Sequence, residues 1–171
     1  MVYQTSINAP RQKTQAIIKQ AAAKAGIELE LKSITASVFF SSDAANPDIY
    51  SRFSTDIQMY TTTQASPDPQ TFMEQFASWE VANKDNKYQG RNITRWRNED
   101  YDKLFKAAES ELDPVKRAAL FIRMNDMVIQ NVVVVPVIWR TKVQAVSSRL
   151  KGVEISGWDN DTANLFNWYR A

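Results

Sequence analysis

The sequence contains no cysteine and no histidine among its 171 residues. Without thiols the chain forms no disulfide and no thiolate metal site, and without imidazole it has no Ser–His or Cys–His nucleophile pair. Catalysis would have to rely on carboxylate, lysine or tyrosine side chains. Asp43, Asp48 and Asp56 lack the glycine and the terminal glutamate of a calcium-binding loop. We therefore expect no metal and no cofactor.

Glycine, proline and long apolar runs are also scarce. The chain has four glycines and six prolines, and 44% of its residues are apolar, which predicts one globular domain over residues 1–171. No stretch approaches the roughly 18 consecutive apolar residues that a membrane-spanning helix needs. No basic-then-apolar leader precedes Tyr3, so an export signal would have to lie outside this sequence.

Charge of neither sign dominates. The chain carries 21 basic and 19 acidic side chains, a net charge of +2, which is too balanced for the broad positive field that binds nucleic acid. Arg91, Arg95, Trp96 and Arg97 do interleave charge with an aromatic ring, as a stacking platform for single-stranded nucleic acid would. Because acidic residues flank this run, we expect a solvated loop anchored by Trp96 and no nucleic-acid partner.

The first 60 residues show a strand–helix–strand pattern. A short strand over 2–6 precedes a helix capped by Asn8 and stopped at Gly26, with an apolar face that includes Ile17. Residues 27–32 alternate apolar and charged residues, as a strand with one buried face does. This order predicts a parallel βαβ unit. A third strand is expected over 56–60.

The second half begins with a polar loop over 83–97. Asn98 then caps an amphipathic helix, and Asp113 with Pro114 starts a second helix that runs to about Gln130 and is expected to be buried on two sides. Residues 132–139 are rich in valine and predict a strand covered on both faces, with 141–147 as its pairing partner. The fold class is therefore α/β, a mixed sheet with at least one parallel βαβ unit, flanked by helices.

Carboxylates near the first of these helices raise the possibility of catalysis. A pair of acidic residues hydrolyses glycosidic bonds when its spacing suits the mechanism. The spacing here does not indicate such a pair, and a solvated helix face explains the same residues. A carboxylate-dependent glycoside hydrolase remains the alternative function, and a nucleic-acid-binding module is the third. The acidic residues concerned are Asp100, Asp102, Glu109, Glu111 and Asp113.

Small polar side chains follow directly on the third expected strand. Residues 61–68 carry hydroxyl, amide and carboxylate groups, at the strand end where open α/β sheets place their ligand crevice. The alternative is a polar turn that only caps the next helix, with Asp68 as cap and Pro69 at the first helical position. Both interpretations stay open on the residues alone.

Three segments in order resemble a known family. They are VYQTSINAPRQKTQAIIKQAAAKAGIELELKSI, DIQMYTTTQASPDPQTFMEQF and WRNEDYDKLFKAAESELDPVKRAALFIRMNDMVIQNVVVVPVIWR. Together they are similar to the extracellular solute-binding proteins of family 5, the peptide and nickel type that serve ABC importers. The likeness covers nearly all of this chain but only the carboxyl-terminal part of a family member. It implies a periplasmic-binding-protein-like lobe, the second lobe of a two-lobe receptor.

The resemblance implies a binding module without catalysis. A peptide or oligosaccharide would bind in the cleft between two lobes and pass to a membrane ABC permease, and the protein would be periplasmic or extracellular. In the peptide-binding branches an aspartate, with a tryptophan three residues before it, meets the amino terminus of the peptide. Here Ala65 and Thr62 stand at those positions. Burying an unpaired ammonium group is costly, so a neutral oligosaccharide or a peptide held elsewhere is favoured.

The candidate site residues follow from the strand-end position and from the resemblance. Four line the cleft, and two aromatic residues offer stacking surfaces. The predicted cleft residues are Thr62, Thr63, Gln64 and Asp68, and the predicted stacking residues are Tyr60 and Trp96.

Overall fold

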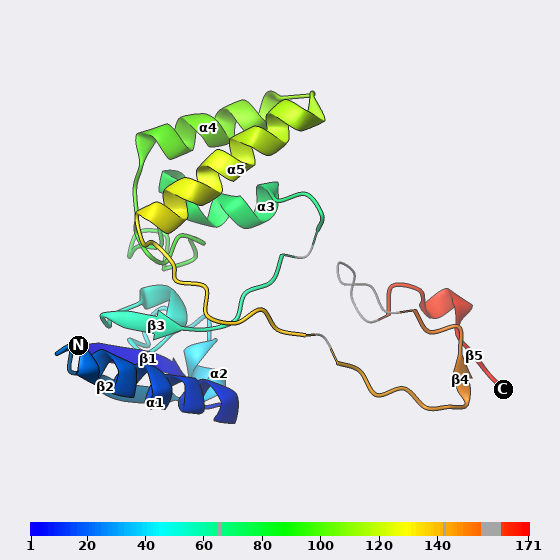
Figure 1. Ribbon diagram of the computed structural model, residues 1–171, viewed down its shortest axis with the longest axis horizontal. Coiled ribbons are helices and arrows are strands. Elements are labelled where there is room, and N and C mark those ends of the chain that lie inside the picture. The colour runs from blue at the N-terminus through cyan, green and yellow to red at the C-terminus, as the bar shows by residue number, and fades with distance from the viewer. Residues whose placement is uncertain (65, 142, 155–161) are drawn as a thin grey trace.

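The structure is a computed structural model, which describes residues 1–64, 66–141, 143–154 and 162–171. Figure 1 shows a layer of sheet and helix at the amino-terminal end, a group of helices above it, and an extended carboxyl-terminal segment. The chain runs from the sheet into the helices and then returns past the sheet edge. The candidate site lies at the carboxyl ends of the strands, where the chain leaves the sheet for the helices.

A parallel sheet of three strands forms the first layer. Strand β1 (Val2–Ser6) lies between β2 (Glu30–Ile34) and β3 (Ile57–Met59), and both neighbours run parallel to it. Helix α1 (Ala9–Lys24) connects β1 to β2, and α2 (Ala36–Phe39) with a short 3₁₀ turn η1 (Tyr50–Arg52) precedes β3. The α/β class and the parallel βαβ unit are confirmed. Among the described residues, antiparallel pairing is confined to a separate pair of strands near the carboxyl end.

Helix α1 packs on the sheet with a different face from the one expected. Ile17 is 66% exposed, whereas Gln15 is buried. Gln15 Nε2 donates to the main-chain oxygen of Tyr3 at 2.7 Å, so the buried amide ties the helix to β1. The prediction of an apolar contact face through Ile17 is wrong, because a hydrogen bond to a strand carbonyl places a polar side chain against the sheet.

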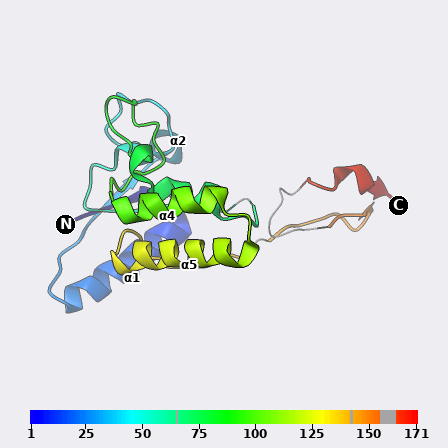
Figure 2. The same ribbon diagram turned by 90° about the horizontal axis from the view of Figure 1, so that it is seen from above.

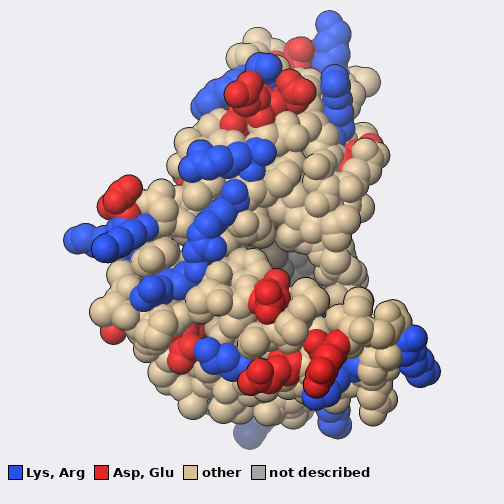
Figure 3. Space-filling model, turned by 90° about the vertical axis from the view of Figure 1, so that its left-hand side faces the viewer, with Lys and Arg blue, Asp and Glu red and all other residues tan. Residues whose placement is uncertain are grey.

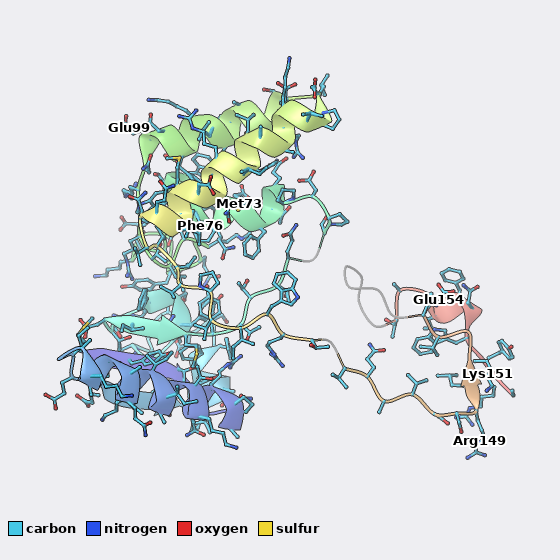
Figure 4. The ribbon with its side chains drawn as sticks, in the orientation of Figure 1. Met73, Phe76, Glu99, Arg149, Lys151 and Glu154 are labelled. Atoms are coloured by element: carbon cyan, nitrogen blue, oxygen red, sulfur yellow. The ribbon has the colours of Figure 1, made fainter. Side chains whose placement is uncertain are left out.

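The second layer is helical. After α3 (Gln70–Met73) come the 3₁₀ turns η2 (Glu74–Phe76) and η3 (Ser78–Glu80), and then α4 (Glu99–Ser110) and α5 (Pro114–Gln130). Asn98 and Asp113 accept hydrogen bonds from the first-turn amides of α4 and α5, as predicted. Met73 and Phe76 point into the space between α3 and the two long helices (Figure 4). The buried core is Met73, Phe76, Tyr101, Phe105, Ala108, Phe121, Met124 and Val128.

Helix α5 is buried on one side only. Phe121, Met124 and Val128 face the core, whereas Val115 is 77% and Ile122 is 63% exposed. The prediction of burial on two sides is wrong for the described residues, because only the α3 and α4 side of this helix is covered. Figure 2 shows α4 and α5 lying side by side with the opposite face of α5 open.

The valine-rich segment is extended but is not a strand. Trp139 is 97% exposed, and no backbone–backbone hydrogen bond joins residues 134–141 to another residue that the structure describes. The prediction of a doubly covered strand over 132–139 paired with 141–147 is wrong for the described residues. Pro136 has no N–H group to give, and no described strand lies alongside. The antiparallel pair β4 (Leu150–Lys151) and β5 (Tyr169–Arg170), with the 3₁₀ turn η4 (Leu165–Asn167), ends the chain.

None of the helices in the described ranges combines the length and the apolar character that crossing a bilayer requires.

Candidate functional site

The carboxyl edge of the parallel sheet gathers polar side chains from three segments. Strands β1 and β3 end at Ser6 and Met59, and Tyr60 and Thr61 follow β3 directly. Arg11, in the first turn of α1, reaches across this edge. Its guanidinium donates to Ser6 Oγ and, through Nη2, to Thr61 Oγ1 at 3.2 Å. We call Ser6, Arg11, Tyr60 and Thr61 the sheet-edge site.

Local sequence explains why Arg11 points there. The side chain of Asn8 caps the helix by accepting from the Arg11 amide at 3.4 Å, and Pro10 lies in the first turn, where its missing N–H is not needed. A helix that starts directly after a short turn from a strand projects its first side chains back over the end of the sheet. Arg11 therefore lies beside the hydroxyl groups at the ends of β1 and β3.

The charge on Arg11 has no acidic partner in the described part of the chain. None of the ion pairs there includes Arg11, and its guanidinium carbon lies 5.6 Å from the centre of the Phe40 ring. Burial, followed by the positive charge of Arg140, lowers the pKa of Arg11. Both effects disfavour the cation, so an anion placed here would relieve them. The site is thus suited to a carboxylate or another small anionic group.

Tyr60 lies on the same edge with an aromatic neighbour. Its ring centre is 5.5 Å from that of Tyr50, with the planes tilted by 51°. Burial, and to a smaller extent Tyr50, raises the pKa of Tyr60. The phenol therefore stays protonated at neutral pH, half-buried, and can donate or accept a hydrogen bond.

The loop after Thr61 opens toward solvent. Thr62 and Thr63 are exposed, and Gln64 Nε2 donates to the main-chain oxygen of Ser66 at 2.8 Å. Ala65, the position that carries an aspartate in the peptide-binding branches of the resembled family, lies outside the described residues. Gln64 also borders a shallow groove between α3 and α5, lined further by Pro69, Phe72, Met73, Phe121, Ile122 and Asn125.

Asp68 is held by the protein itself. Its carboxylate accepts from Arg117 Nη1 at 2.9 Å and from Arg117 Nη2 at 3.1 Å, and it also accepts from the Gln70 amide at 2.9 Å. The hydrogen bonds from Arg117, and then the one from Gln70, lower the pKa of Asp68. Helix α3 begins at Gln70 with Pro69 at its cap position, so Asp68 lies one residue before the predicted place, although its carboxylate still accepts from the Gln70 amide. The use of Asp68 as a ligand contact stays a prediction.

Trp96 belongs to the helical layer. Its ring centre lies 5.2 Å from that of Tyr101 with the planes at 75°, an edge-on contact with the core. Among the described residues, no hydrogen bond or ring contact joins Trp96 to residues 60–68. The structure therefore brings Thr61, the chain neighbour of Tyr60, to Arg11, but leaves Trp96 apart from them.

Three arginines were not predicted from the sequence: Arg11 at this site, Arg140, whose charge acts on Arg11, and Arg117 beside Asp68. Arg11 could have been found from its place in the first turn of a helix that directly follows a strand. Arg140 and Arg117 lie far along the chain, and Arg117 is 49 positions from Asp68. No local signal connects such residues, since their contacts depend on how the helices pack.

The acidic residues considered for catalysis have structural partners. Asp113 caps α5, Asp102 accepts from the Ser78 amide at 2.9 Å, and Asp100 pairs with Lys103. Glu109 pairs with Lys106, and Glu111 accepts from the Asp113 amide. Within the described ranges no group of three acidic side chains is placed to hold a metal ion. The geometry does not favour a pair of catalytic carboxylates here.

Comparison with known proteins finds relatives and solved structures that this chain resembles. No protein-family model matches the sequence. The dipeptide-binding protein DppE of Bacillus subtilis is 28% identical over 86 residues, which are 50% of this chain and 14% of that protein. The oligopeptide-binding protein of Thermus thermophilus, solved with a pentapeptide, is 25% identical with a TM-score of 0.64, and the match covers 78% of this chain and 23% of that one.

The chain is similar to peptide-binding solute-binding proteins of the family 5 type. A further structure shares the fold: DppA of Helicobacter pylori, in complex with the peptide STSA, has a TM-score of 0.75 at 16% identity, covering 99% of this chain and 30% of that one. The matched parts of this chain cover between 14% and 30% of the length of these three proteins.

Proposed function

We propose that this chain is part of the substrate-binding component of an ABC importer, and that it binds a peptide without catalysing a reaction. The relatives support this proposal, since DppE is named as a dipeptide-binding protein and the Thermus thermophilus protein was solved with a pentapeptide. They are binding proteins by name, which argues against the glycoside hydrolase alternative.

The single observation that carries the proposal is the positive charge of Arg11. None of the described carboxylates forms an ion pair with it. A free peptide ends in a carboxylate, and a guanidinium holds a carboxylate through two parallel hydrogen bonds. Arg11 lies at the carboxyl edge of the sheet, beside the hydroxyls of Ser6 and Thr61. We assign the carboxyl end of the peptide to the sheet-edge site.

The other end of the ligand is held differently from the family pattern. The loop offers no acidic side chain at Ala65 or Thr62, and the carboxylate of Asp68 already accepts from Arg117. A peptide anchored by its carboxylate therefore suits this chain better than one anchored by its ammonium group. An oligosaccharide is the second candidate, because the exposed hydroxyls of Thr62 and Thr63 suit a neutral ligand.

The proposal also covers the place of this chain in a larger protein. We propose that residues 1–171 act as the second lobe, that the ligand is enclosed when a first lobe closes over it, and that the whole protein works outside the cytoplasm with a membrane permease. Closure hides the ligand from water, so this lobe alone should bind its ligand weakly, in about the millimolar range.

Calorimetric titration with di-, tri- and tetrapeptides and with a matched set of oligosaccharides tests the proposal. We expect weak heats of binding from peptides and none from sugars. Arg11→Gln should remove the peptide signal. Arg123→Gln is the matched control, because Arg123 is exposed on α5 and has no ion-pair partner in the described residues.

Two outcomes would contradict this assignment. Sugar binding that survives Arg11→Gln would identify the ligand as neutral, and equal losses from Arg11→Gln and Arg123→Gln would mean that only net charge matters. Gln64→Ala, in the loop after β3, should weaken binding more than Glu109→Ala. Glu109 is the control because its carboxylate pairs with Lys106 on the outer face of α4.

A further inference from the structure

The positive charge of the chain is concentrated in one loop. Residues 81–97, which we call the basic loop, contain five basic side chains and one acidic side chain. The remainder of the chain has 16 basic and 18 acidic side chains, so it is net negative by two charges while the basic loop is net positive by four. A net charge of +2 for the whole chain conceals this separation.

The basic side chains are exposed and mostly unpaired. Lys84, Lys87, Arg91, Arg95 and Arg97 all lie on the surface. Among the described residues, only Arg91 of these five forms an ion pair, with Glu74 at 3.3 Å. Figure 3 shows Lys and Arg side chains gathered in a band across one face of the molecule. Three carboxylates lie near these cations: Glu74 pairs with Arg91, Glu80 accepts from the Arg91 main-chain amide at 3.2 Å, and Asp85 belongs to the loop. The five cations outnumber them, so this face keeps a net positive field.

The basic loop is rigidly held despite having no regular secondary structure. Asn92 is buried and its amide donates to the main-chain oxygens of Phe76, Ala77 and Trp96 at distances between 2.9 and 3.2 Å. A side chain at Gly90 would place its Cβ 2.2 Å from the main-chain oxygen of Glu80, so the two segments pass in close contact. The charges are thus presented on a fixed frame.

Neighbouring groups extend the charged face beyond the loop. Arg95 donates to the main-chain oxygens of Arg52 and Phe53, and the Arg52 guanidinium lies 5.0 Å from the centre of the Tyr88 ring. The partners in these contacts are main-chain oxygens and an aromatic ring. Neither guanidinium is therefore neutralised by an ion pair with a carboxylate. Arg52 brings a sixth cation to the same face.

We propose that the basic loop docks the protein on an anionic membrane surface by contacting lipid phosphates. Guanidinium groups bind phosphate through their fork of N–H donors, and clusters of four to eight basic residues are attracted to anionic lipid surfaces. The charges are spread over a face rather than gathered around a pocket, which suits an array of phosphates. This inference rests on the proposed function, because a component that serves a membrane permease works beside a bilayer, whereas a nucleic acid has no place in that setting.

Flotation with phosphatidylcholine vesicles, with and without phosphatidylglycerol, tests the inference. The chain should bind only the anionic vesicles, and high salt should release it. The double variant Lys84→Glu with Lys87→Glu should weaken binding by about tenfold or more. Neither ammonium group has a hydrogen-bond partner in the described residues, so both variants should fold, which a thermal melt checks.

The matched control reverses two lysines on another face. Lys13→Glu with Lys19→Glu changes the net charge by the same amount on the exposed side of α1, and should weaken vesicle binding by less than about twofold. Equal losses from the two pairs, no binding to anionic vesicles, or tighter retention by single-stranded DNA at the same salt would overturn the inference. Peptide binding should be unchanged in all these variants, so the result is independent of the test of Arg11.

Discussion

Arg117 donates two parallel hydrogen bonds to the Asp68 carboxylate, from Nη1 to Oδ2 at 2.9 Å and from Nη2 to Oδ1 at 3.1 Å. The same guanidinium donates through Nε to the main-chain oxygen of Ala108 at 3.0 Å and stacks over Phe121 at 4.8 Å. One side chain therefore ties the end of the candidate loop to both long helices. The loop after β3 is positioned by α4 and α5 as well as by the sheet.

Asp68→Asn should reduce stability modestly. Asp68 is 52% exposed in its side chain and Arg117 is 22% exposed, so the loss should be about 0.5 to 1 kcal/mol, as for other partly exposed pairs. Urea unfolding at neutral pH measures it. Asp126→Asn, on the exposed side of α5, is the control and should change little.

The pH dependence of this pair has a definite sign. Because Arg117 lowers the pKa of Asp68 in the folded protein, the pair stabilises the fold above the unfolded pKa, about 3.9 for an aspartate. That contribution is lost as the pH falls through the folded value. The stability gap between the native chain and Asp68→Asn should be constant near neutrality and shrink below about pH 4. A gap that grows on acidification would contradict the pairing.

Asp113→Ala should destabilise the start of α5. Asp113 Oδ1 accepts from the Val115 amide at 2.8 Å and from the Lys116 amide at 3.2 Å. Losing this acceptor should cost about 0.5 to 2 kcal/mol, whereas Asp113→Asn should keep most of the stability. Thermal melts of the three proteins compare them. Unchanged stability in the alanine variant would show that α5 begins elsewhere.

Tyr101→Phe tests the buried hydrogen bond at the centre of the helical layer. The Tyr101 hydroxyl donates to the main-chain oxygen of Met73 at 2.6 Å. Removing it loses one buried hydrogen bond, at a cost of about 0.5 to 1.5 kcal/mol. Tyr88→Phe is the control, because the described residues give its hydroxyl no partner and its ring still lies beside Arg52. Similar losses from both would mean that the phenol matters only through its ring.

Whether residues 1–171 form one domain stays a prediction, which unfolding experiments test. Trp79 and Trp96 lie in the helical layer, where they contact Phe105 and Tyr101. In a variant with Trp139, Trp158 and Trp168 replaced by phenylalanine, the fluorescence of the two remaining tryptophans reports that layer, whereas circular dichroism reports the sheet and helices together. One domain requires the two signals to change in a single coincident transition. Separate transitions would divide the sheet layer from the helical layer.

The parts of the fold that depend on neighbouring residues could be predicted from the sequence. Asn8, Asn98 and Asp113 cap the helices they precede, because a cap acts within one turn of its own position. The parallel βαβ unit follows from the same local order. Residues 132–139 show the limit of this reasoning, since a β-branched run becomes a strand only where another strand offers it hydrogen bonds.

The candidate site was predictable in part. The strand-end position placed residues 60–68 at the carboxyl edge of the sheet, where Tyr60 and Thr61 do lie. Arg11 was not predicted, although its place in the first turn after β1 was a local signal. Its contact with Thr61, 50 positions away, could not be foreseen, because it depends on the parallel pairing of β1 with β3. The role of Arg117 beside Asp68 depends in the same way on the packing of α5.

A paired titration tests the central claim most directly. One peptide is prepared with a free carboxyl end and with an amidated end, and each is titrated calorimetrically into this chain and into Arg11→Gln. If Arg11 binds the carboxylate, the free-acid peptide should bind the native chain at least about tenfold more tightly than its amide, a difference of about 1.4 kcal/mol. Arg11→Gln should remove that preference. Equal affinity of the two peptides for the native chain would contradict the assignment of the sheet-edge site.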